Sequence, residues 1–151
     1  PDRDLLKIAV AERHHNTGHI GLGYVKGYGL RQGAVATSIA HDSHNIIAVG
    51  TNNDDLAFAI NRIAELRGGI AVIDGGKILA ELPLPVAGLM SDAPLEEVND
   101  LLEQAKAAAH RLGVSAGIDP FMTLSFMSLP VIPSLKITTR GVFDVEQWKY
   151  I

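Results

Sequence analysis

A short polar segment between two apolar runs carries the side chains best suited to chemistry. The stretch Val35–Gly50 reads VATSIAHDSHNIIAVG, and its polar centre consists of His41, Asp42, Ser43, His44 and Asn45. The β-branched residues on both sides predict two strands with a loop between them, and such loops often hold functional residues. Imidazole and carboxylate groups there could contact the polar edge of a ligand ring or move a proton near neutral pH. The alternative is a polar turn whose side chains bond only to nearby backbone groups.

A metal site built by this chain is the first specific chemistry to consider. Five of the six histidines lie between positions 14 and 44, and with Glu12 and Asp42 they offer ligands suited to zinc, iron or manganese. His15 and His19 are four residues apart, but the Asn-Thr-Gly between them breaks the helix that would place both on one face. The sequence has no H-E-x-x-H motif, and it lacks the cysteines of the zinc deaminase signature. We therefore expect no metal ligand among these residues.

Two further chemistries fit poorly. The segment 41–44 holds every group type of a nucleophilic triad, but a triad depends on a geometry that sequence neighbours seldom have. Five glycines between positions 18 and 29 suggest a phosphate loop, yet G-x-x-x-x-G-K-[ST] is absent and no strand-to-helix switch follows. These glycines instead predict a tightly turned segment.

Composition limits the class of protein. With 151 residues, 47% of them hydrophobic and 20% charged, the chain is expected to form a single domain over residues 1–151 with its own apolar core. The net charge is −4 and the basic residues are scattered, which argues against nucleic acid or an anionic membrane as a partner. The absence of cysteine excludes disulfides and fits a cytoplasmic protein. Because the chain starts at Pro1 instead of Met, we expect it to be a piece of a longer protein.

The elements that would position the polar loop are mostly strands. Apolar and β-branched runs predict strands over Leu5–Glu12, Gly33–Ala40 and Ile46–Val49. Between the first two, the segment Arg13–Arg31 is rich in glycine and is predicted to be extended and loop-rich.

Three helices are predicted from their start signals. Asn52 and Asn53 predict the start of the first helix, which ends at Gly68-Gly69. Ser91 or Asp92 predicts the start of the second and longest helix. Asp119-Pro120 predicts the start of a short apolar helix that ends before Pro130 and Pro133.

Hairpins account for most of the remaining chain. Gly75-Gly76 predicts a tight turn between Ile70–Asp74 and Lys77–Leu82, and a second hairpin is predicted around Arg140-Gly141. The two prolines of Leu82–Met90 place that segment at a sheet edge or between layers. Since hairpins outnumber βαβ units, the predicted fold is α+β, a mainly antiparallel sheet with packed helices.

Several long blocks of this sequence resemble a known family. The blocks are NTGHIGLGYVKGYGLRQGAVATSIAHDSHNIIAVGTN, GGIAVIDGGKILAELPLPVAGLMSD and LKITTRGVFDV. In this order they closely resemble the C-terminal domain of bacterial adenine deaminases, members of the amidohydrolase superfamily. The similarity runs from His15 to Val145 and so covers nearly the whole chain.

The resemblance implies an enzyme that hydrolyses adenine to hypoxanthine and ammonia with a metal-activated water. In that family the metal, which could be manganese, iron or zinc, lies in a preceding (β/α)8 barrel. The superfamily's H-x-H ligand pair does not occur here, so no metal ligand transfers to this chain and the isolated chain is expected to be inactive. The loop 41–45 would then approach the barrel mouth and close the pocket, contact the purine or help to shuttle a proton.

Two other functions stay open. An assembly domain would form homo-oligomers through the exposed part of LPLPVAGLM or through the longest helix. An independent small-molecule binder would bind purine without the barrel.

Overall fold

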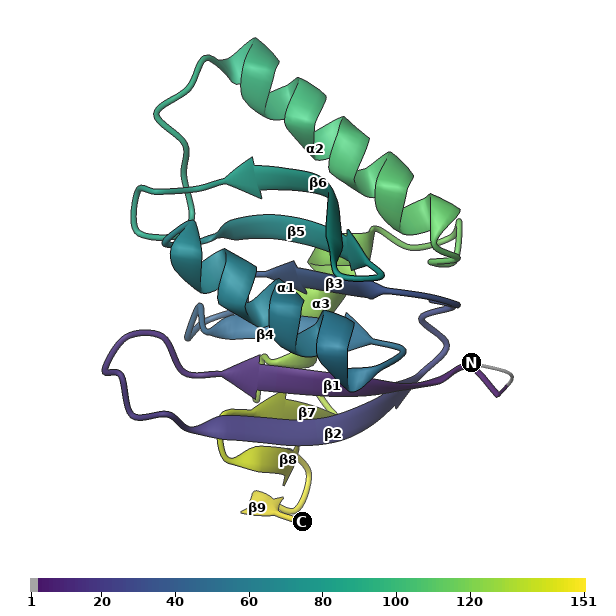
Figure 1. Cartoon of the computed structure of the whole chain (residues 1–151). Coiled ribbons are helices and arrows are strands. Elements are labelled where there is room, and N and C mark those ends of the chain that lie inside the picture. The colour runs from purple at the N-terminus through teal and green to yellow at the C-terminus, as the bar shows by residue number, and fades with distance from the viewer. Residues whose placement is uncertain (1–2) are drawn as a thin grey trace.

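The computed structural model describes residues 3–151 and places six antiparallel strands in one central sheet (Figure 1). Their order across the sheet is β2-β1-β4-β3-β5-β6. The strands are β1 (Leu5–Ala11), β2 (Ile20–Lys26), β3 (Ala34–Thr37), β4 (Ile46–Gly50), β5 (Gly69–Asp74) and β6 (Lys77–Pro83).

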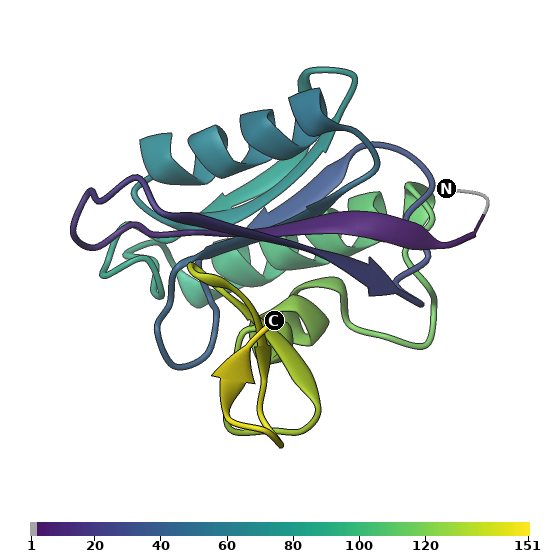
Figure 2. The ribbon, with the colours of Figure 1, turned by 90° about the horizontal axis from the view of Figure 1, so that it is seen from below.

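Helices cover both faces of this sheet. One face carries α1, and the other carries α2, α3 and a three-stranded antiparallel sheet in the order β7-β8-β9 (Figure 2). The elements are α1 (Asn53–Glu65), α2 (Leu95–Arg111), α3 (Pro120–Met127), β7 (Leu135–Thr138), β8 (Gly141–Asp144) and β9 (Lys149–Tyr150). The predicted α+β class with a mainly antiparallel sheet is confirmed.

Side-chain size differs between the two faces of the sheet. Successive strand residues point to opposite faces, so each central strand contributes to two cores. The α1 face is lined largely by alanines, among them Ala9, Ala36, Ala48 and Ala71, whereas leucine, isoleucine and valine dominate the opposite face. Small side chains let α1 lie close to the sheet, and the larger ones fill the space beneath two helices and a second sheet.

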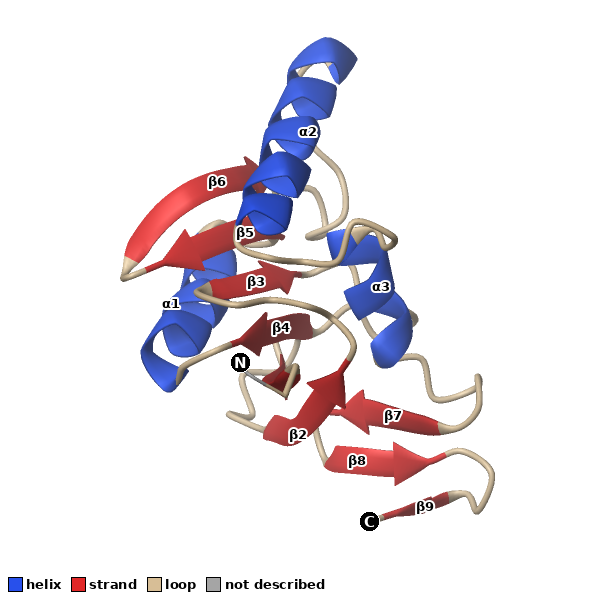
Figure 3. Ribbon diagram, turned by 90° about the vertical axis from the view of Figure 1, so that its right-hand side faces the viewer, coloured by secondary structure: helices blue, strands red, loops and turns tan. Residues whose placement is uncertain are grey.

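The prediction of a loop-rich passage over Arg13–Arg31 was wrong for its central part, which forms β2. Glycine weakens a strand interior, but it is used where another backbone approaches closely. A Cβ built on Gly21 would lie 1.8 Å from the carbonyl oxygen of Thr138, and one on Gly23 would lie 3.2 Å from Ile137. The glycines therefore allow the β7–β8 hairpin to lie against β2, as Figure 3 shows.

The predicted start of α1 and the hairpin after it are confirmed. The side chain of Asn52 caps the helix by accepting from the backbone N–H of Asp55 at 2.8 Å. The Asp55 carboxylate in turn accepts from the N–H groups of Gly75 and Gly76, at 3.2 and 2.8 Å. One buried carboxylate thus joins the start of α1 to the β5–β6 turn.

The prediction that Ser91 or Asp92 caps α2 was wrong. The cap position is Pro94, which makes no side-chain capping bond, and Ser91 instead accepts from the N–H of Ala93. A proline has no N–H and a fixed φ, so it can start a helix without a polar cap. The preceding Leu82–Met90 segment is extended at the sheet edge, as predicted, only up to Pro83, where β6 ends. The prediction was wrong for the rest, which turns back on itself through a bridge between Val86 and Met90.

Asp119 caps α3 as predicted, and it also joins two helices. Its Oδ1 accepts from the N–H groups of Phe121 and Met122, and its Oδ2 pairs with Lys106 of α2 at 3.2 Å. The helix ends at Met127, before either of the two prolines. The closing hairpin is also confirmed, as β7 and β8.

Candidate functional site

Three connections meet at one end of the central sheet. They are the β1–β2 connection (residues 12–19), the β3–β4 connection (residues 38–45) and the start of the β6–α2 connection (residues 84–90), which all lie on the left in Figure 1. The predicted polar loop, His41 to Asn45, belongs to the second of these. We call residues 41–45 the HDSHN loop.

Helix α3 holds the first residue of the HDSHN loop. The backbone N–H of His41 donates to the carbonyl oxygen of Ser125 at 3.1 Å, and the Ser128 hydroxyl donates to the carbonyl oxygen of His41 at 3.1 Å. The His41 ring also packs against Phe126, with the ring centroids 5.1 Å apart. The loop is therefore fixed to a rigid element from one side.

The β1–β2 connection holds the last residues of the loop. Nε of Arg13 donates to the carbonyl oxygen of His44 at 2.6 Å, and the Arg13 N–H donates to Oδ1 of Asn45 at 3.3 Å. Nε2 of His14 lies 2.6 Å from the carbonyl oxygen of Ser43 and must donate to it, because a carbonyl oxygen only accepts. Three carbonyl groups of the HDSHN loop thus accept from side chains outside it.

Glu12 organises the β1–β2 connection itself. Its carboxylate accepts from the backbone N–H groups of His14, His15 and Thr17 and from the Thr17 hydroxyl. Desolvation opposes ionisation, but these hydrogen bonds outweigh it and lower the pKa of Glu12 to about 2. The ionised side chain keeps His14 in place for its contact with Ser43.

The ring of His44 bonds within its own turn. The backbone N–H of Ala40 donates to Nδ1 of His44 at 3.2 Å, and His44 lies in the left-handed region with φ of +48°. The His41 ring is 5.7 Å away, centroid to centroid. Desolvation is the main cause that lowers the pKa of His44, and the nearby His41 and Arg13 lower it further.

A pocket of about 240 Å³ lies beside the loop and involves the second sheet. Its lining residues are Asp42, Ser43, Asn45, Ser128, Pro130, Val131, Thr138 and Thr139. The pocket therefore collects carboxylate, amide and hydroxyl groups from three separate parts of the chain. The rings of His41 and His44 lie outside its lining.

Neither a triad nor a metal centre forms within residues 3–151. Among them no hydrogen bond joins the Ser43 hydroxyl to a histidine ring, and no group of three histidine, aspartate or glutamate side chains could hold a metal ion. The residues present do not fit the metal that the resemblance implies. They suit polar recognition by amide, hydroxyl and imidazole groups.

Sequence reasoning found the HDSHN loop but missed the residues that hold it. Arg13, Ser125 and Ser128 lie 31, 84 and 87 residues from their partners in the loop. A lone arginine in a glycine-rich segment and two serines in an apolar helix carry no local signal of such contacts. Only the tertiary structure brings them together.

The fold and site define a class of protein: an α+β domain that presents a firmly held polar loop and contains no metal centre within its described residues. The family described as adenine deaminase C-terminal domain matches residues 1–149. The chain belongs to this family.

Curated relatives named adenine deaminase match nearly all of the chain. The Bacillus licheniformis protein is 54% identical over 150 residues, which are 99% of this chain and 26% of the relative. The relative from Nitratidesulfovibrio vulgaris strain DP4 is 53% identical over 151 residues, and that from Bacillus subtilis strain 168 is 52% identical over 148 residues. The chain spans about a quarter of the length of these relatives.

Proposed function

We propose that these residues act as one domain of an enzyme that hydrolyses adenine to hypoxanthine and ammonia in purine catabolism. The name of the relatives supports the reaction. The structural observation that supports a role in it is the polar loop, which is held by the β1–β2 connection on one side and by α3 with its C-cap residue Ser128 on the other. The proposal includes a cytoplasmic location, residues 1–151 as a single domain, and a metal, manganese, iron or zinc, held outside this chain in a preceding (β/α)8 barrel. The isolated chain would then have no deaminase activity.

In this proposal the HDSHN loop faces the barrel mouth, where the active sites of such folds lie. His41, Asp42, Ser43, His44 and Asn45 would close the pocket and contact the purine, or help to move a proton. The support is chemical and geometric. A purine edge presents hydrogen-bond donors and acceptors, and the loop offers imidazole, carboxylate, hydroxyl and amide groups on a backbone fixed from two sides.

The test uses the full-length enzyme with His41→Ala and His44→Ala. Both variants should lower kcat at least several-fold while the metal content per subunit stays unchanged. His110→Ala is the matched control, because it removes a histidine from the end of α2 without touching the loop. Wild-type kinetics in both loop variants would contradict the proposal.

An exposed apolar surface favours a second function, assembly. Ile20, Leu22 and Tyr24 alternate along the edge strand β2 and are 55%, 56% and 71% exposed. A groove of about 360 Å³ runs between this strand and α1. This surface is better suited to a subunit contact than α2, whose outer side carries exposed acidic residues such as Glu96, Glu97 and Glu103.

Sedimentation of the full-length enzyme at several concentrations tests assembly. Tyr24→Lys should shift the equilibrium toward smaller species if β2 forms a subunit contact. Equal sedimentation of wild type and variant would count against it.

A further inference from the structure

The backbone contact of His44 determines where its ring can carry a proton. The N–H of Ala40 lies 3.2 Å from Nδ1, and a backbone N–H can only donate. Nδ1 must therefore accept, so that the ring is neutral and its single proton sits on Nε2. A second proton on Nδ1 would place two donors against each other.

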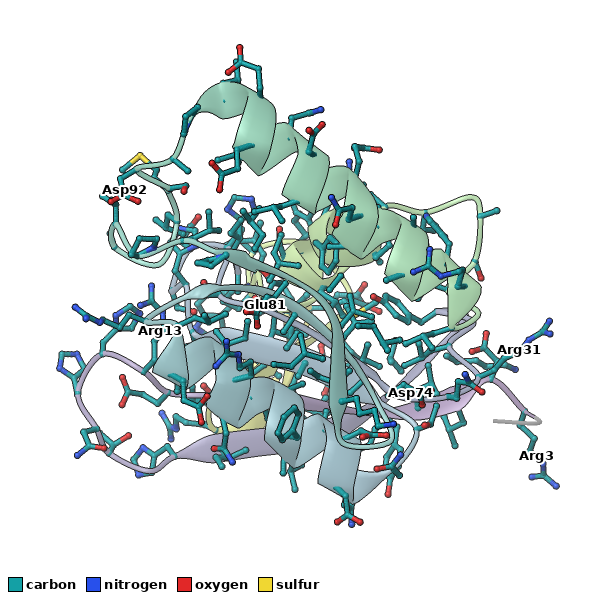
Figure 4. The ribbon with its side chains drawn as sticks, turned by 45° about the horizontal axis from the view of Figure 1, so that its top comes forward. Arg3, Arg13, Arg31, Asp74, Glu81 and Asp92 are labelled. Carbon is teal, nitrogen blue, oxygen red and sulfur yellow. The ribbon has the colours of Figure 1, made fainter. Side chains whose placement is uncertain are left out.

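Arg13 fixes the backbone on which this ring stands. Its Nε donates to the carbonyl oxygen of His44 at 2.6 Å, and its Nη2 donates to the carbonyl oxygen of Ala87 at 2.7 Å. A Cβ built on Gly88 would lie 2.5 Å from the guanidinium, so a larger residue there would require the arginine side chain to move. Figure 4 shows Arg13 at this end of the sheet.

The arginine is joined to carbonyl oxygens and not to a carboxylate. Among residues 3–151 no ion pair involves Arg13, so its positive charge is not neutralised by a partner. It therefore acts electrostatically on the neighbouring ring as well as holding the backbone.

The charges around His44 act mostly in one direction. Arg13 and His14 from the β1–β2 connection and His41 from the loop disfavour a second proton on the ring, and Asp42 alone favours it. Desolvation acts in the same direction as the three basic groups, and together they lower the pKa of His44. Geometry and charge thus favour the same neutral ring.

We propose that Arg13 is a positioning residue that holds His44 as a neutral imidazole whose Nε2–H donates to a hydrogen-bond acceptor of the ligand. For the proposed substrate class this acceptor is a ring nitrogen of the purine, and that assignment rests on the proposed function. His44 then recognises the substrate by donation from Nε2–H and does not take up a second proton, at Nδ1, near neutral pH.

Histidine ¹⁵N NMR tests the ring state directly. The probe is the side-chain nitrogen spectrum of the ¹⁵N-labelled full-length enzyme, with the His44 signals assigned by comparison with His44→Gln. At pH 7 the expected spectrum shows His44 as the neutral Nε2–H tautomer. A predominant Nδ1–H tautomer or a protonated ring at pH 7 would overturn the proposal, whatever the kinetics show.

Arg13→Gln and Arg13→Lys separate positioning from simple folding. In Arg13→Gln the loss of charge and of the Nε bond should shift the titration of His44 to higher pH and mix the two tautomers. Arg13→Lys keeps the charge, so His44 should titrate at nearly the wild-type pH, but the preference for the Nε2–H tautomer should be weaker. If Arg13→Gln does not fold, the Arg13→Lys spectrum still decides, because a wild-type tautomer ratio together with wild-type kinetics would exclude positioning by the guanidinium.

Two His44 variants test the donor itself. Gln can present an N–H near the position of Nε2, whereas Asn can replace only the Nδ1 contact. We expect His44→Asn to lower kcat/KM for adenine about tenfold more than His44→Gln, the size of one lost hydrogen bond. Equal losses would refute recognition by Nε2–H. An Nε2–H tautomer combined with wild-type kinetics in both variants would uphold the ring state and reject the proposed function.

Discussion

Single side chains outside the HDSHN loop set its shape. Arg13, His14 and Ser128 each donate to a different carbonyl group of the loop. Glu12 acts indirectly, because its carboxylate fixes the β1–β2 connection that carries two of these donors, Arg13 and His14. The loop is therefore ordered by long-range contacts made mostly to its backbone, and the side chains of Asp42 and Ser43 stay exposed.

Glu12 should make stability depend on pH in acid. Its pKa falls from 4.5 to about 2 in the folded chain, so the ionised carboxylate favours folding. This stabilisation is fully present above pH 4.5 and is lost as the pH falls from 4.5 toward 2. Glu12→Gln should therefore unfold at a lower urea concentration than wild type at pH 7, and the gap should close by pH 2.

Urea unfolding at several pH values measures this gap. Glu146→Gln removes an exposed carboxylate and controls for the change in net charge. A gap between Glu12→Gln and wild type that stays constant from pH 7 to pH 2 would contradict the role of the ionised carboxylate.

At the scale of elements, the sequence of β2 is explained by the strands that it contacts. It pairs with β1 along its whole length, and its two interior glycines face the second sheet. A methyl group at position 21 cannot fit beside the Thr138 carbonyl without moving one backbone from the other.

Gly21→Ala should lower the free energy of unfolding by about 1–3 kcal/mol, because the added carbon forces β7 and β8 away from β2. Gly117→Ala is the matched control, since a Cβ there meets no atom within 4 Å. It should change the stability by no more than about 0.5 kcal/mol. Equal stability of the two variants in urea would show that the sheets do not touch at Gly21.

The cap of α1 gives a second test at this scale. Asn52→Ala removes the acceptor for the Asp55 N–H and should cost about 1 kcal/mol of stability. Asn52→Ser keeps a capping oxygen and should recover most of the loss, and a serine variant as unstable as the alanine variant would argue against capping.

The comparison of β2 with α1 shows what local sequence can predict. Helix α1 has its cap, its acidic first turn and its glycine stop within one short segment, so each signal acts locally. The strand β2 reads IGLGYVK, in which large residues alternate with glycine, and glycine in a sequence usually indicates a turn. The glycines are needed because β2 lies against a hairpin more than 100 residues later in the chain, and no local pattern can predict that contact.

The same limit applies to the candidate site. The HDSHN loop between two apolar strands could be predicted, since polar residues between β-branched runs are a local pattern. The contacts that Arg13 and α3 make with this loop could not be predicted, because they depend on how distant connections meet at the end of the sheet. Neither could the pocket, whose walls come from the loop, from residues 128–131 after α3 and from the β7–β8 hairpin.

At the scale of the whole molecule, both faces of the sheet are covered but one edge surface stays open. The face of β2 beside α1 exposes Leu22 and Tyr24. No helix of the described residues is long and apolar enough to cross a membrane. The side chains proposed to contact a ligand lie in the β3–β4 connection at one end of the sheet.

The isolated chain should neither deaminate adenine nor regain activity when manganese, iron or zinc is added. The reason is that residues 3–151 bring together no three side chains able to hold a metal ion. Ammonia release from adenine, measured against the full-length enzyme at equal molar concentration, checks this. Metal-dependent turnover by the chain alone would contradict it.

The most direct test is the position of the HDSHN loop in a crystal structure of the full-length enzyme with a transition-state analogue of adenine hydrolysis. We predict that Nε2 of His44 lies about 3 Å from an acceptor atom of the analogue, a hydrogen-bond distance, or reaches it through one water. A loop that faces solvent, or lies farther from the analogue than one bridging water can span, would contradict a role of this domain in the adenine site.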